Sequence, residues 1–210
     1  MAETRRSHWE TVYGEKRVDG VSWFEAKPAR SLALIDSLDV ALDDAIIDVG
    51  GGASLLVDEL LRRGFRDLSV LDIAINPLAV ARARLGTRAA EVSWLVEDVT
   101  LWQPPRDRYA LWHDRAVFHF LIEAADRQAY MRAVTRGLRP GGHLILATFA
   151  PSGPERCSGL PVQRYNSGEL AAAVGPAFEL IRSEMAAHLT PGGATQDFTW
   201  CVFEKRGLTS

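Results

Sequence analysis

The sequence has few cysteines, no long apolar run and no block of basic residues, and each absence excludes a class of protein. Its two cysteines, Cys157 and Cys201, stand far apart and match no metal-ligand spacing, which favours a reduced, cytoplasmic protein. No apolar run approaches the roughly 20 residues of a membrane span. The opening residues, MAETRRSHWE, lack the apolar core of a secretory signal.

Charge and residue order exclude further classes. The formal net charge is −3, and no long basic run occurs, so neither nucleic acid nor an anionic membrane is expected as the main partner. No set of potential ligands has metal-binding spacing, so no metal is expected. With 210 residues, 47% of them hydrophobic, the chain is long enough for one α/β domain, and no repeat or linker divides residues 1–210.

Strand-like and helix-like segments alternate along most of the chain. This alternation predicts a doubly wound α/β sheet with helices on both faces, closed by an antiparallel hairpin. Ligands of such sheets bind at the carboxyl ends of the strands. Expected helix starts include Ser7, Asn76 and Asp114, each read as an N-cap. The expected strands are residues 45–49, 68–72, 91–96, 109–113, 143–149, 178–188 and 196–206.

The stretch AIIDVGGGAS, residues 45–54, places three glycines after an apolar strand that carries an acid. Gly50 and Gly52 fit a dinucleotide fingerprint, but Leu55 stands where a small residue is needed for close helix packing. A phosphate-binding P-loop would require a lysine at the end of the loop, and none is there. Asp48 is a poor neighbour for pyrophosphate and a good one for a positively charged ligand.

The same stretch resembles motif I of class I S-adenosylmethionine-dependent methyltransferases, acid-x-Gly-x-Gly-x-Gly, with Ser54 in place of the last glycine. Asp72 stands twenty residues after Gly52 and matches the family's acid that accepts hydrogen bonds from both ribose hydroxyls. Asp98 matches the acid that contacts the adenine amino group. Acids at the ends of three successive strands, together with the glycine loop, indicate S-adenosylmethionine as cofactor and S-adenosylhomocysteine as product.

The resemblance extends over nearly the whole chain and implies the strand order 3-2-1-4-5-7-6 for a seven-stranded sheet. The segment WHDRAVFHF is similar to the WDRG segment of thiopurine methyltransferases. The opening HWETVYG…VSWF resembles the aromatic N-terminal cover of small-molecule and some protein-lysine methyltransferases, so residues 1–40 are expected to cover the cofactor. The implied cofactor-binding residues are Trp9, Tyr13, Trp23, Asp48, Gly50, Gly51, Gly52, Ser54, Asp72, Ile73, Asp98, Val99 and Asp114.

The methyl acceptor, a small molecule or a protein side chain, is expected beside strand four and the loop of residues 150–166. If Asp114 caps a helix, Arg115 and His119 share one helix face at the acceptor pocket, and His119 orients the nucleophile or takes its proton. The alternative for His119 is a structural role. In the loop, Arg164 and Tyr165 are expected to hold the acceptor and Cys157 to line its pocket. The alternative is a solvated loop with an ordinary ion pair at Arg164.

Two other functions fit the same architecture. One is a nicotinamide-dependent oxidoreductase, against which Leu55 argues. The other is a methyltransferase-like fold that only binds a ligand or partner. Calorimetry with S-adenosylmethionine and with NADH separates the first alternative from methyl transfer.

Overall fold

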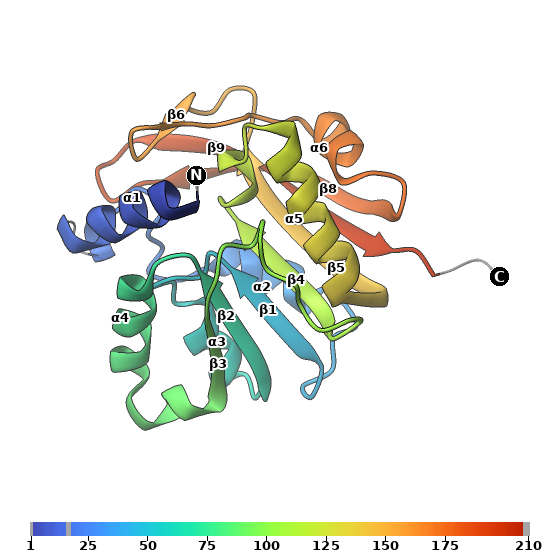
Figure 1. The fold of residues 1–210 in the computed structure, drawn as a ribbon, viewed down its shortest axis with the longest axis horizontal. Coiled ribbons are helices and arrows are strands. Elements are labelled where there is room, and N and C mark those ends of the chain that lie inside the picture. The colour runs from blue at the N-terminus through green and yellow to red at the C-terminus, as the bar shows by residue number, and fades with distance from the viewer. Residues whose placement is uncertain (1, 16–17, 208–210) are drawn as a thin grey trace.

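The computed structural model describes residues 2–15 and 18–207, and its centre is a seven-stranded sheet (Figure 1). The strands lie in the order β3-β2-β1-β4-β5-β9-β8. Because β6 and β7 pair only with each other, this is the predicted order 3-2-1-4-5-7-6 of the sheet strands, which is confirmed. The strands are β1 (Ala45–Val49), β2 (Asp67–Asp72), β3 (Val92–Val96), β4 (Tyr109–Arg115), β5 (Leu138–Phe149), β6 (Arg156–Cys157), β7 (Leu160–Pro161), β8 (Phe178–Leu189) and β9 (Thr195–Lys205).

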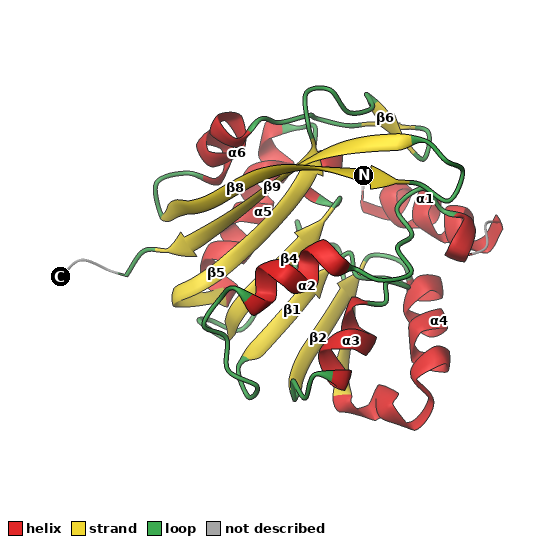
Figure 2. Ribbon diagram, turned by 180° about the vertical axis from the view of Figure 1, so that it is seen from behind, coloured by secondary structure: helices red, strands yellow, loops and turns green. Residues whose placement is uncertain are grey.

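Helices cover both faces of the sheet, as predicted (Figures 1 and 2). Successive strand residues point to opposite faces, so Ile46 packs in one apolar cluster with α2, α3 and α4, whereas Ile47 packs in the other with α5 and α6. The helices are α1 (Ala2–Glu15), α2 (Ala29–Asp36), α3 (Leu56–Arg62), α4 (Ile75–Leu85), α5 (Ala124–Gly137) and α6 (Ser167–Val174), with short 3₁₀ turns η1 (Val18–Gly20), η2 (Gly86–Glu91) and η3 (Phe118–Phe120).

Three predicted helix starts are wrong, and at α4 a contact from another helix explains the difference. Helix α1 begins at Ala2, so Ser7 lies in its interior. Helix α4 begins at Ile75, one residue before the predicted cap Asn76, and the carboxylate of Glu10 in α1 accepts hydrogen bonds from the backbone N–H groups of both residues, at 2.7 and 3.3 Å. Asp114 lies inside β4, and only the turn η3 follows before α5.

The first five sheet strands are parallel, so their carboxyl ends meet along one edge of the sheet. Helix α1 lies across this edge, next to α4 (Figure 1). The glycine loop, the acids that follow β2 and β3, and the N-terminal aromatic residues are therefore brought together. In the part of the chain that the structure describes, the helices are too short or too polar to cross a membrane.

Candidate active site

The three glycines of the loop are each required by a close approach. Gly50 and Gly52 have positive φ angles of 69° and 45°, a backbone conformation that other residues rarely adopt. A Cβ atom at Gly51 would lie 2.5 Å from Oδ2 of Asp48, and one at Gly52 would lie 2.9 Å from Oδ2 of Asp72. Bare backbone thus lets the loop run directly beside two carboxylates.

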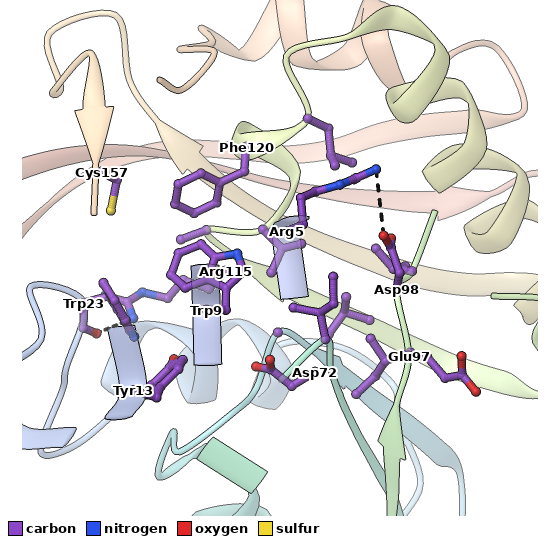
Figure 3. A pocket seen from close by; sticks show the side chains of 18 residues that line it. Arg5, Trp9, Tyr13, Trp23, Asp72, Glu97, Asp98, Arg115, Phe120 and Cys157 are labelled. Carbon is purple, nitrogen blue, oxygen red and sulfur yellow. Dashed lines mark hydrogen bonds and ion pairs between the residues drawn. The ribbon is translucent and has the colours of Figure 1, made fainter. Parts of the chain in front are cut away.

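Two adjoining cavities open around this loop. The first is lined by residues of α1, the glycine loop, the ends of β2 and β3, and the turn after β4. Figure 3 shows Asp98 and Glu97 at one end of it and Trp23 and Cys157 at the other. The second cavity adjoins the first, and Gly50 and Arg115 line both.

Asp72 is buried at the end of β2 and lines the first cavity. Its Oδ1 accepts a hydrogen bond of 2.9 Å from the backbone N–H of Ala74. Burial, aided by the negative charges of Asp48 and Glu10 and opposed by this hydrogen bond, raises the pKa of Asp72 to about 7. A carboxylate in such surroundings is stabilised by further donors, and a pair of ribose hydroxyls would supply them.

Asp98 has a buried oxygen that lacks a hydrogen bond. Its Oδ1 accepts from the backbone N–H and the hydroxyl of Thr100, at 2.9 and 2.6 Å. Its Oδ2 is buried without a hydrogen-bond partner among the described residues, and Arg5 Nη2 is 3.8 Å away. Because an unsatisfied buried acceptor is costly, this atom fits a ligand N–H donor such as an adenine amino group. Ile73 and Val99 line the same end of the cavity.

The second cavity carries charges of both signs. Asp48, which is 5% exposed, lines this cavity. Gly51, Ser54 and Arg115 line it as well. A cavity that holds both anionic and cationic side chains fits a group that bears both an ammonium and a carboxylate. The residues present therefore fit S-adenosylmethionine over its whole length, with the aminoacyl group here and the nucleoside in the first cavity.

The end of the first cavity away from Asp98 is walled by aromatic rings. Trp9 makes edge contacts with Trp23 and with Phe120, at centroid separations of 5.9 and 5.0 Å, and Tyr13 contacts Trp23 at 6.0 Å. Nη1 of Arg115 donates to the carbonyl of Trp23 at 2.9 Å (Figure 3), and Nη2 lies 3.2 Å from the carboxylate of Glu25. Arg115 thereby fastens the segment after α1 to the end of β4.

The structure corrects the predicted face shared by Arg115 and His119. Arg115 ends β4, whereas His119 lies in the turn η3, fully buried against the ring of Phe149, and lines neither cavity. Burial, reinforced by the nearby charge of Arg115, lowers the pKa of His119 to about 3. His119 is therefore neutral near pH 7 and lies outside the site, so the structure supports the alternative, structural role.

Asp114, Arg164 and Tyr165 also lie away from the cavities. The carboxylate of Asp114 is buried and accepts hydrogen bonds from the backbone N–H of Val117 and from the hydroxyl of Tyr130. Arg164 makes an ion pair of 3.0 Å with Glu155 and donates to the carbonyl of Pro151. The Tyr165 ring is buried beside Phe118. The structure thus contains the ordinary ion pair at Arg164 that was the alternative to an acceptor-binding role.

Several residues of the site were missed by sequence reasoning. Phe120 and Arg5 line the first cavity, and Ser31 and Glu25 line the second, where they join His113. Ser31 and Glu25 carry no local signal, because helix α2 and the segment before it meet β1 and β4 only in three dimensions. Cys157 was predicted to line the acceptor pocket, and it lies in the wall of the first cavity.

Comparison with known proteins agrees with this geometry. Residues 46–142 match the family model described as "Methyltransferase domain". EEF1A lysine methyltransferase 2 of Mus musculus is 21% identical over 97% of this chain and 84% of its own length. Methyltransferase GfsG of Streptomyces halstedii is 29% identical over 61% of this chain, which spans 46% of that protein.

Solved structures show the same fold. A SAM-dependent methyltransferase from Anabaena variabilis aligns with a TM-score of 0.74 at 15% identity, covering 98% of this chain and 95% of that one. The Burkholderia thailandensis 1,6-didemethyltoxoflavin-N1-methyltransferase, solved with its substrate and S-adenosylhomocysteine, aligns with a TM-score of 0.67 at 18% identity, covering 98% and 85%. Residues 46–142 therefore form a methyltransferase domain, and the chain has the fold of S-adenosylmethionine-dependent methyltransferases. The ligand in that Burkholderia structure, S-adenosylhomocysteine, is the product of the methyl donor expected from the sequence.

Proposed function

We propose that this methyltransferase acts on a small molecule held beneath the aromatic wall of Trp9, Trp23 and Phe120. The observation that carries the proposal is this wall: Arg115 binds Trp23 and Glu25 in the segment after α1, and the Trp9 ring of α1 packs against Trp23 and Phe120. A covered cavity excludes water and holds the acceptor in line with the methyl group. We propose residues 1–40 as this cover; residues 1, 16 and 17 lie outside the described part of the chain.

The acceptor in this proposal is already nucleophilic at neutral pH. Burial raises the pKa of Tyr13, so its hydroxyl keeps its proton, and Arg115 is a cation. Among the described residues, no histidine lines the first cavity. A thiolate, a neutral amine or a carboxylate needs little help from a base. When bound, S-adenosylmethionine supplies an electrophilic methyl group on a sulfonium, and the C–S electron pair returns to sulfur.

The remaining roles follow from position. We assign Asp72 to the two ribose hydroxyls, Asp98 to the adenine amino group, and Ile73 and Val99 to the faces of the adenine ring. The loop residues Gly50 to Gly52, with Ser54 and Asp48, hold the aminoacyl group. Tyr13, Trp9 and Trp23 close over the sulfonium, whose charge their ring faces favour. Arg115 and Cys157 border the acceptor.

A lysine side chain of a protein is the second candidate acceptor. It is supported by the mouse relative, which is named a lysine methyltransferase and aligns over 97% of this chain. A long, narrow amine would also fit between aromatic walls. We further propose a cytoplasmic location, because the chain has only two cysteines, far apart in the sequence, and Cys201 is a buried thiol.

Transfer of a labelled methyl group tests the proposal and separates the two acceptors. Purified protein is incubated with methyl-labelled S-adenosylmethionine and either the small-molecule or the protein fraction of a cell lysate, and then with defined thiols, amines and carboxylates. We expect label in a small product, and none with Asp72→Ala at cofactor concentrations near the wild-type Kd. Label confined to protein would replace the small-molecule acceptor by the side chain.

A further inference from the structure

In the second cavity, Asp48 is the first member of a buried chain of three side chains. Nδ1 of His113 lies 2.7 Å from Oδ1 of Asp48, and Nε2 of His113 lies 2.9 Å from Oγ of Ser31. The three side chains are 5%, 2% and 1% exposed. Asp48 and His113 are paired residues of the parallel strands β1 and β4, so the register of the sheet places them side by side. Ser31 comes from α2.

The direction of each hydrogen bond follows from the chemistry of the groups. An ionised carboxylate only accepts, so His113 donates from Nδ1 to Asp48. With the Nδ1 proton directed at Asp48, Nε2 can accept the hydroxyl proton of Ser31. The carboxylate thus selects the tautomer of His113, and Ser31 helps to fix the plane of its ring. The ring in turn fixes the orientation of the Asp48 carboxylate.

This arrangement uses one oxygen of Asp48 and leaves the other available. Oδ1 is taken by His113, whereas Oδ2 faces the glycine loop, so close that a Cβ at Gly51 would lie 2.5 Å away. Within residues 2–15 and 18–207, the hydrogen bonds of Asp48 do not involve Oδ2, and Asp48 lines the cavity. The carboxylate therefore presents one oriented, negatively charged oxygen to a ligand.

We propose that His113, held by Ser31, is a positioning residue that orients Asp48 so that Oδ2 accepts a hydrogen bond from the α-ammonium group of S-adenosylmethionine. His113 itself touches Asp48 and Ser31 and acts through them. Hydrogen bonds that support a ligand-binding group commonly strengthen ligand binding, since they restrict the group to the orientation that binds. A Ser-His-Asp chain here serves ligand binding rather than nucleophilic catalysis, because Ser31 is only 1% exposed.

Two ligands that differ only in the aminoacyl part test this role without any methyl transfer. S-adenosylhomocysteine carries the α-ammonium group, whereas 5′-methylthioadenosine has the same nucleoside and thioether without it. Calorimetry gives the Kd of each ligand for wild type, His113→Phe and Ser31→Ala. His113→Phe keeps a ring of similar size and removes both nitrogen atoms.

By analogy with supporting residues of other sites, we expect His113→Phe to raise the Kd of S-adenosylhomocysteine about tenfold and to leave the Kd of 5′-methylthioadenosine within about twofold. Ser31→Ala should raise the Kd of S-adenosylhomocysteine by a smaller factor. In the double variant with His113→Phe, it should raise that Kd no further. His113→Asn, whose amide still donates to Asp48, should recover part of the loss. An equal loss for both ligands would make His113 merely structural, and no loss for either would overturn the proposal. If His113→Phe does not fold, Ser31→Ala alone tests the proposal. A larger rise in the Kd of S-adenosylhomocysteine than in that of 5′-methylthioadenosine would support it, and equal changes would overturn it.

Discussion

The two ends of the first cavity are built in different ways. The cofactor end consists of residues at the carboxyl ends of neighbouring parallel strands: Asp72 at the end of β2 and Asp98 just after β3. The cover end is assembled from α1, the turn η3 and the small β6–β7 hairpin, which contribute Trp9, Phe120 and Cys157.

This difference explains why the cofactor end could be predicted from the sequence and the cover end could not. Parallel strands in register bring their ends together whatever side chains they carry, so position along the chain translates directly into position in space. No such rule relates Trp9 to Phe120, whose rings touch across 111 positions of the sequence. The cofactor end is a property of the sheet, and the cover end is a property of how separate segments pack on it.

The largest expected effect breaks the cofactor end. Asp72→Ala removes a buried, charged acceptor, and we expect it to weaken S-adenosylhomocysteine binding by roughly 2–4 kcal/mol, because two hydrogen bonds to a carboxylate are lost. Calorimetry measures this directly. The matched control is Asp67→Ala at the opposite end of the same strand, where the carboxylate makes a half-exposed ion pair with Arg108; its Kd should be unchanged. Equal affinities of Asp72→Ala and wild type would remove Asp72 from the ribose site.

An intermediate effect concerns His119, just behind the cover end. Its pKa is about 3 in the folded protein and about 6.5 in an unfolded chain. Between these values the unfolded state binds the extra proton, so stability rises with pH across this window. From pH 7.5 to pH 5.0, His119 alone should lower the free energy of unfolding by about 2 kcal/mol, since each pH unit below 6.5 contributes about 1.4 kcal/mol.

Urea unfolding of wild type and His119→Asn at the two pH values measures this contribution. Asparagine can still accept the hydrogen bond that the backbone N–H of Phe149 gives to Nδ1 of His119. Burial raises the pKa values of Asp72 and Asp114 to about 7 and about 6, which gives a dependence of opposite sign, so the difference between the two proteins is the quantity to compare. Identical pH dependence would mean that His119 titrates normally in the folded state and is open to solvent.

The smallest expected effect is at Arg164, in the loop between β5 and α6. Because its guanidinium pairs with the exposed Glu155 and with backbone carbonyl groups, we expect Arg164→Ala to cost about 0–1 kcal/mol of stability and to leave methyl transfer unchanged. Thermal unfolding and the labelled-methyl assay measure the two quantities, with Arg156→Ala in the same loop as control. A rise in the acceptor KM confined to Arg164→Ala would return this residue to the acceptor site.

Much of the fold was predictable, and the errors share a cause. The strand order, the helices on both faces and the closing hairpin follow from local periodicity and turn residues. The start of α4 could not be predicted in this way, because Glu10 from another helix caps it. The structure after β4 could not either, because β4 continues through Arg115 before the turn at His119. A local capping pattern cannot reveal a partner supplied from elsewhere in the chain.

The sequence by itself determined the cofactor end: a glycine loop after one strand and acids at the ends of three strands specify a ligand class, because parallel β-structure fixes their mutual positions. Only the tertiary structure decided the rest. It placed Phe120 beside Trp9, turned His119 into the core, left Arg164 in a surface ion pair, and joined Ser31 to His113 behind Asp48. These relations depend on side-chain packing between segments distant in the chain, and residue order carries no distance information about such pairs.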